Sequence, residues 1–149
     1  MRSARAMMLM LVCASLVLLL STCIDLGNDP NIEFVVPDGF HGVFVIKHDE
    51  LAGTPPERSG NLIRYKIPKS GVLKTSDIEP LRVWHSESAR YASGKKVPQL
   101  TGDPGEQRIL YALDTDDRGQ RAWLIGTKAD AGKYWKDRVV WFEIESAAE

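Results

Sequence analysis

The N-terminal stretch constrains this chain most, because it joins two arginines to a long run without charge. Arg2 and Arg5 precede the run, which extends from residue 6 to residue 24 and is almost entirely apolar. A positive end followed by a short apolar helix is the design of a secretory signal. An uncleaved membrane anchor is the alternative, since a spanning helix needs about 17–25 residues. Both predict that the rest of the chain lies outside the cytoplasm.

The end of the apolar run adds a third alternative. Leu20-Ser21-Thr22-Cys23 resembles the bacterial lipobox, in which an aliphatic residue and two small residues precede a cysteine that is acylated and becomes the new N-terminus. Thr22 departs from the pattern, which usually has Gly, Ala or Ser at this place. We expect lipidation at Cys23, which would attach the chain to a membrane of the bacterial cell envelope. A secreted protein and a single-pass membrane protein are the alternatives.

Charge and cysteine content limit what the remainder can be. The whole chain has a formal net charge of −1, and the leader contributes two positive charges, so the remainder carries −3. Without a block of like charge, no nucleic-acid partner is expected. Cys13 and Cys23 both lie in the leader, so the exported part has no disulfide and no thiolate metal site. We expect a leader over 1–23, a polar tether over 24–31 and one globular domain over 32–149.

Most of this domain has the pattern of short β-strands. Residues 62–67 alternate most cleanly, with Tyr65 on the apolar face and Arg64 and Lys66 on the other. Residues 32–36 and 42–48 are predicted to pair as a hairpin, and 108–114 and 121–126 as another, with Gly119 in its turn. Further strands are expected over 81–86 and 138–145, although residues 86–91 could instead be helical.

One short helix is predicted over residues 127–137. Thr127 and Asp130 have the spacing of a capping box, and Gly132 weakens the helix that follows. The fold class expected is therefore mainly β: a single antiparallel β-sandwich-like domain with one short helix, preceded by the leader.

Few residues have a pattern that indicates catalysis. The three histidines, His41, His48 and His85, lack the HxH or HExxH spacing of a zinc site. The acidic turn that holds Asp114, Asp116 and Asp117 does not follow a calcium loop, because its fifth position is Arg118. We therefore predict no metal, no cofactor and no catalytic residue. A small hydrolase or metal-dependent enzyme that uses the histidines and the acidic turn is the alternative, and it requires at least two of the four residues His41, His48, His85 and Asp114 to converge in a pocket.

Aromatic residues offer the clearest candidates for recognition. Flat rings on one face could stack on a sugar or a peptide, although filling the core is the competing explanation. The candidates for a binding surface are Trp84, Trp123, Tyr134, Trp135 and Trp141.

Three segments together resemble an uncharacterised family of bacterial exported domains, often lipoproteins. They are residues 36–45 (VPDGFHGVFV), 64–75 (RYKIPKSGVLKT) and 124–127 (LIGT). The resemblance implies an extracytoplasmic β-rich module and carries over no catalytic residue. We therefore expect a small, non-enzymatic, membrane-tethered binding or assembly module whose partner is a protein or a glycan.

Overall fold

The computed structural model describes residues 29–100, 102–115 and 120–136. Within these ranges the chain forms eight strands, one turn of 3-10 helix (η1) and one α-helix (α2). The elements are β1 Asn31–Val36, β2 Gly42–His48, β3 Glu57–Ser59, β4 Leu62–Lys66, β5 Val72–Thr75, η1 Glu79–Leu81, β6 Ser86–Tyr91, β7 Ile109–Thr115, β8 Arg121–Gly126 and α2 Lys128–Lys136. No helix in the described part of the chain is long and apolar enough to cross a membrane.

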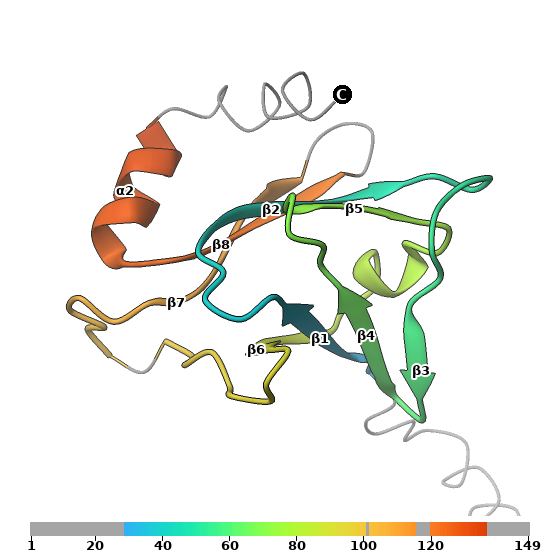
Figure 1. Ribbon diagram of the computed structural model, residues 1–149, viewed down its shortest axis with the longest axis horizontal. Helices are drawn as coiled ribbons and strands as arrows, with labels where there is room; N and C mark the ends of the chain where they lie inside the picture. Colours follow the sequence, from blue (N-terminus) through green and yellow to red (C-terminus); the bar gives the residue numbers. More distant parts are fainter. Residues whose placement is uncertain (1–28, 101, 116–119, 137–149) are drawn as a thin grey trace, which may run out of the picture.

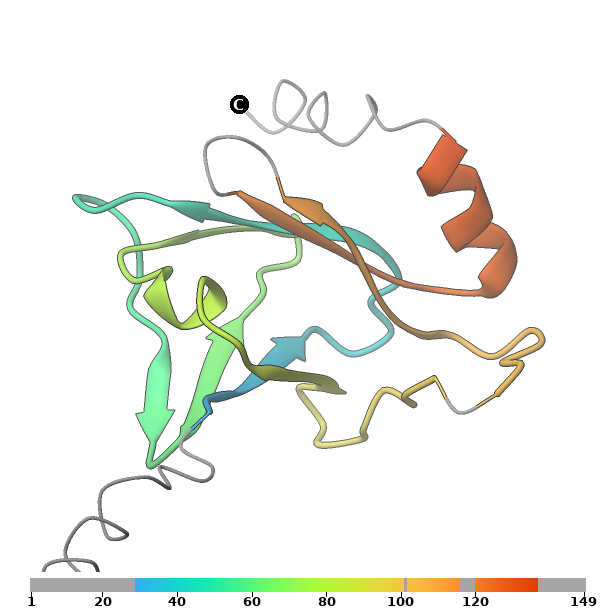
Figure 2. The same cartoon turned by 180° about the vertical axis from the view of Figure 1, so that it is seen from behind.

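The strands form two four-stranded sheets that enclose one main core (Figure 1, Figure 2). The first sheet has the order β3-β4-β1-β6, and the second has the order β5-β2-β8-β7. Buried side chains of both sheets meet between them, including Phe34 of β1, Tyr65 of β4, and Phe44 and Trp123 of the second sheet. The expectation of a mainly β, sandwich-like domain with one short helix is confirmed.

Strand direction differs from the expectation, because both sheets are mixed rather than antiparallel. Strand β1 runs parallel to both of its neighbours, β4 and β6, and β2 runs parallel to β5. The other three pairings are antiparallel. The reason is the path of the chain, which crosses repeatedly from one sheet to the other. Each parallel pair joins strands that are separated in the sequence by at least one strand of the other sheet, which gives the long connection that parallel pairing requires.

Two proline-glycine turns make two of these crossings, from β1 to β2 and from β4 to β5. The turn after β1 closes with Phe40 N donating to the Pro37 carbonyl at 3.0 Å, and the turn after β4 closes with Gly71 N donating to the Pro68 carbonyl at 3.0 Å. Gly39 and Gly71 adopt φ of 75° and 78°, which favours glycine. The predicted hairpin between 32–36 and 42–48 is therefore wrong, because the turn carries the chain into the second sheet. The unit formed by β1, its turn and β2 lies beside the unit formed by β4, its turn and β5, because β1 pairs with β4 and β2 pairs with β5.

The register predicted for residues 62–67 is confirmed. Ile63, Tyr65 and Ile67 are all buried, whereas Lys66 is exposed and Arg64 is half-buried. Because successive side chains of a strand point to opposite faces, this register places the charged residues of β4 on the outer face of the first sheet.

The C-terminal elements of the described chain also follow the prediction. Strands β7 and β8 pair antiparallel, and α2 follows β8 directly. Asp130 accepts hydrogen bonds from the backbone N and the hydroxyl of Thr127, both at 2.9 Å, and these bonds lower the pKa of the Asp130 carboxyl. This is the predicted capping arrangement. The predicted turn at Gly119 and the predicted strand over 138–145 lie outside the described residues.

Residues 79–91 have a different secondary structure from the one predicted. Residues 79–81 form η1, residues 82–85 are not a strand, and residues 86–91, for which a helix was the alternative, form β6. Pairing with β1 along six residues decides the conformation, and it buries Ala89 against the core. Tertiary pairing thus overrides a local sequence that has weak preference for a strand.

Candidate binding surface

The outer face of the first sheet gathers polar side chains from strands that are distant in sequence. Glu33 of β1 lies opposite Arg64 of β4 on one side and Ser88 of β6 on the other. Residues that share a register in neighbouring strands point to the same face. Parallel pairing of β1 with β4 and β6 therefore creates a charged row across the sheet.

Glu33 is the centre of this row. Arg64 Nε donates to Glu33 Oε2 at 2.7 Å, and Arg90 Nε forms an ion pair with the same oxygen at 3.2 Å. The side chain of Glu33 is only 17% exposed. Because two guanidinium groups pair with one of its oxygens, the carboxylate is held in one position. Towards the sheet edge, Lys66 forms an ion pair with Glu57, and its hydrogen bond lowers the pKa of the Glu57 carboxyl.

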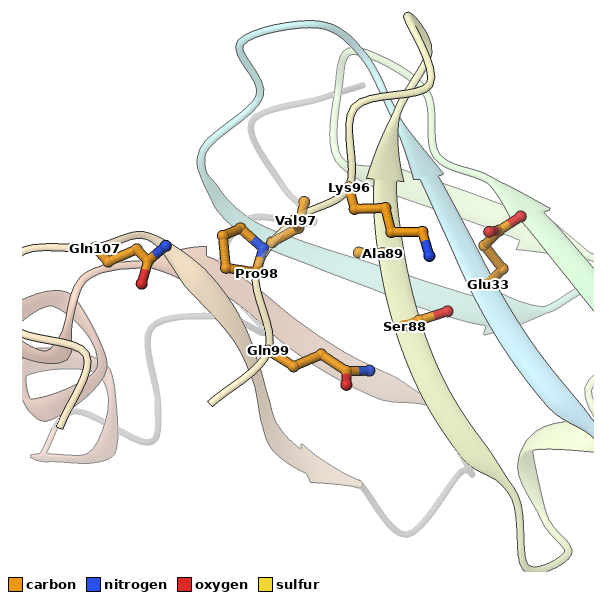
Figure 3. Close-up of a pocket in the computed structure, with 8 residues that line it drawn as sticks. All are labelled: Glu33, Ser88, Ala89, Lys96, Val97, Pro98, Gln99 and Gln107. Carbon is orange, nitrogen blue, oxygen red and sulfur yellow. The ribbon is translucent and has the colours of Figure 1, made fainter. Parts of the chain in front are cut away.

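A pocket of about 450 Å³ lies beside this row (Figure 3). Its size is within the range of small-ligand sites, about 300–1,000 Å³. The lining residues are Glu33, Ser88, Ala89, Lys96, Val97, Pro98, Gln99 and Gln107. Figure 3 shows the Lys96 side chain extending across β6 towards β1, the Ser88 hydroxyl on the β1 side of β6, and the Gln99 amide directed towards β6. A carboxylate, a hydroxyl, an amine and two amides thus line one hollow together with the apolar side chains of Ala89, Val97 and Pro98.

The wall of the pocket is a segment that returns along the edge of β6. Tyr91 N donates to the Lys95 carbonyl at 2.8 Å, and Val97 N donates to the Ala89 carbonyl at 2.9 Å. Further along, Gln99 Nε2 donates to the Glu87 carbonyl at 3.2 Å. These bonds cover the edge of the sheet and fix Lys96 between two anchored residues.

The aromatic residues proposed from the sequence do not form one surface. Trp123 lies in the core with 1% exposure, which corrects its assignment to a binding surface. Its neighbours Phe34 and Phe44 lie with ring centroids 4.5 Å and 5.5 Å away, and its Nε1 donates to Glu87 Oε2 at 2.9 Å. Trp84 is 84% exposed. Tyr134 is half-buried on α2; Trp141 and the side chain of Trp135 lie outside the described residues.

The three histidines bind to three different parts of the chain. His41 Nδ1 lies 3.1 Å from the Gly39 carbonyl, and His48 Nε2 lies 3.3 Å from the Ser76 carbonyl. His85 is nearly buried, with Nε2 lying 2.9 Å from Glu87 Oε1. No group of three or more metal-ligating side chains occurs in the described ranges.

Sequence reasoning missed the pocket residues, although one of them gave a signal. Glu33 interrupts a strand that is otherwise rich in β-branched and aromatic residues, and its position on the outer face followed from alternation. Ser88, Lys96 and Gln99 gave no such signal, because their proximity to Glu33 depends on β6 lying next to β1.

Comparison with known proteins gives little further information. No protein-family model matches the chain, and no curated protein matches it. Among solved structures, a "Putative Lipoprotein from Bacillus anthracis" is similar with 8% sequence identity and a TM-score of 0.45, over 78% of this chain and 94% of that protein. A likeness this weak carries no argument about function.

Proposed function

We propose that this chain is an extracytoplasmic, membrane-tethered lipoprotein whose domain acts as a small, non-enzymatic binding module. The anchor is supported by the leader and by the resemblance of residues 20–23 to a lipobox. The binding role is supported by one structural observation: the pocket beside Glu33 collects hydrogen-bonding side chains from β1, β6 and the returning segment 95–99.

The chemistry of the pocket favours an acidic glycan as the ligand. Lys96, Gln99 and Ser88 offer donors and acceptors that match hydroxyl and amide groups, and Val97 and Pro98 offer an apolar surface for the ring carbons. The Glu33 carboxylate is already engaged by Arg64 and Arg90. Arg64 and Arg90 do not line the pocket, but their pairing with Glu33 offsets its charge. Lys96 is then the remaining cation of the lining, which favours a ligand that carries a carboxylate group over a neutral one.

Binding to peptidoglycan sacculi tests this proposal, because sacculi are an envelope glycan that carries carboxylates. The full chain, extracted from membranes in detergent, is sedimented with purified sacculi at increasing concentration. We expect Lys96→Ala and Gln99→Ala each to weaken binding by about tenfold, because each removes a hydrogen bond to the ligand and a factor of ten corresponds to about 1.4 kcal/mol.

Lys74→Ala is the matched control, because Lys74 is an exposed lysine on β5 in the second sheet. Its affinity should equal that of the parent. Equal losses in Lys74→Ala and Lys96→Ala would mean that attraction is a general charge effect and would contradict a role for the pocket. Full binding by both pocket variants would contradict it as well.

A further inference from the structure

An exposed apolar patch lies where the chain enters the domain. The exposed Val83 and Trp84 and the half-buried Pro30 form this patch, which we call the entry patch. Val83 is 53% exposed and Trp84 is 84% exposed. Pro30 and Val83 both line an open hollow of about 360 Å³, whose other lining residues are Arg58, Gly60, Asn61, Ile63, Glu79 and Pro80. Adjacent exposed apolar side chains of this size often mark an interaction site.

Backbone hydrogen bonds fix the entry patch beside the start of β1. Ser86 N donates to the Pro30 carbonyl at 3.2 Å, so the residue two positions after Trp84 is held against the incoming chain. Asn31 N donates to the Asn61 carbonyl at 2.8 Å on the other side. The patch therefore cannot move away from the point at which the N-terminal segment joins the domain.

A chain of side-chain contacts supports the loop that carries Trp84. His85 Nδ1 donates to the Val83 carbonyl at 2.6 Å, which closes a tight turn with Trp84 at its tip. The other ring nitrogen of His85 lies 2.9 Å from Glu87, and Glu87 accepts the indole N–H of Trp123 in the core. The Trp84 side chain is thus exposed to solvent on a loop that the contacts of His85 and Glu87 attach to the core.

The distance to the proposed anchor is short. Cys23 precedes Pro30 by seven residues. A fully extended chain advances about 3.3–3.6 Å per residue, so the two lie at most about 25 Å apart. Whatever path these residues take, a lipid at Cys23 would hold the entry patch close to the bilayer surface.

We propose that the entry patch rests on the bilayer, with the Trp84 indole in the headgroup region. Tryptophan prefers this interface, because its ring is apolar and its N–H can still bind water or headgroups. The nearby cations are neutralised: Arg58 pairs with Asp77, and Arg82 pairs with Glu79 at 2.9 Å. We therefore attribute the orientation of the domain on the bilayer to contact through the Trp84 indole and not to attraction between cations and anionic lipid. This inference rests on the membrane anchor in the proposed function.

Quenching by brominated lipid tests the orientation. The full chain from bacterial membranes is reconstituted into phosphatidylcholine vesicles with and without bromine on the acyl chains, and tryptophan emission is compared. We expect brominated vesicles to quench part of the parent's emission and expect Trp84→Phe to lose most of that quenched part. The other tryptophans are present in both proteins, so the difference reports Trp84 alone.

Two results would overturn the inference, and they are distinguishable. If the chain sediments with the vesicles but quenching is absent, or is the same in Trp84→Phe, the anchor stands and the orientation falls. If the chain does not sediment with the vesicles, the anchor fails, and the orientation that rests on it fails with it.

Discussion

Replacing Trp123 by alanine is expected to lower the free energy of unfolding by about 3–5 kcal/mol, the cost of removing a large buried aromatic side chain. Trp123 is 1% exposed and packs against both Phe34 of the first sheet and Phe44 of the second. The substitution opens a cavity between the two sheets and also leaves Glu87 without the indole N–H that it accepts. Chemical denaturation followed by far-ultraviolet circular dichroism measures the loss.

The control is the same substitution at an exposed tryptophan. Trp84 is 84% exposed, so Trp84→Ala should change the unfolding free energy by no more than about 0.5 kcal/mol. Equal costs at Trp84 and Trp123 would contradict the placement of Trp123 in the core and would reopen its assignment to a binding surface.

Tyr65→Ala is expected to have an effect of the same size, about 3–5 kcal/mol. The ring is 1% exposed, and its hydroxyl donates to the Asp77 carbonyl at 3.0 Å. Burial raises the pKa of Tyr65, so the folded protein keeps this proton above pH about 10, where an unfolded tyrosine loses it. Stability that depends on Tyr65 is therefore complete below pH about 10 and falls as the pH rises further. Denaturation in urea at neutral pH gives the cost of the substitution.

Lys66→Ala provides the control on the same strand. Lys66 points to the outer face and is exposed, and its partner Glu57 is exposed as well, so we expect loss of the pair to change the free energy of unfolding very little. A large cost at Lys66 together with a small cost at Tyr65 would mean that β4 has the opposite register.

Local patterns in the sequence predicted the elements whose structure is decided locally. Alternation placed Ile63, Tyr65 and Ile67 in the core, and the spacing of Thr127 and Asp130 located the start of α2. These features need only nearby residues, because a strand face or a helix cap is determined within a few positions.

Strand neighbours were not predictable in the same way. The turn at Pro37–Gly39 indicates a reversal, but nothing in these residues says whether the next strand pairs with β1 or crosses to a second sheet. The pocket beside Glu33 depends on that choice, since it forms only when β6 lies next to β1. Residues Ala122–Ile125 were ambiguous for another reason: side chains on both faces of β8 are buried, so alternation could not separate Trp123 from an exposed tryptophan.

Mass spectrometry of the N-terminal peptide, from protein extracted from the membranes of a bacterial host, tests the central claim of a membrane-tethered lipoprotein most directly. We expect a peptide that begins at Cys23 and carries acyl chains, because Cys23 ends the apolar run and Leu20 lies three residues before it. Each buried CH₂ contributes about 0.8 kcal/mol, so two or more chains would hold the domain stably at a bilayer. An intact leader that begins at Met1 would indicate a spanning anchor instead. An unmodified N-terminus at or beyond residue 23 would indicate a secreted protein and would contradict the membrane assignment.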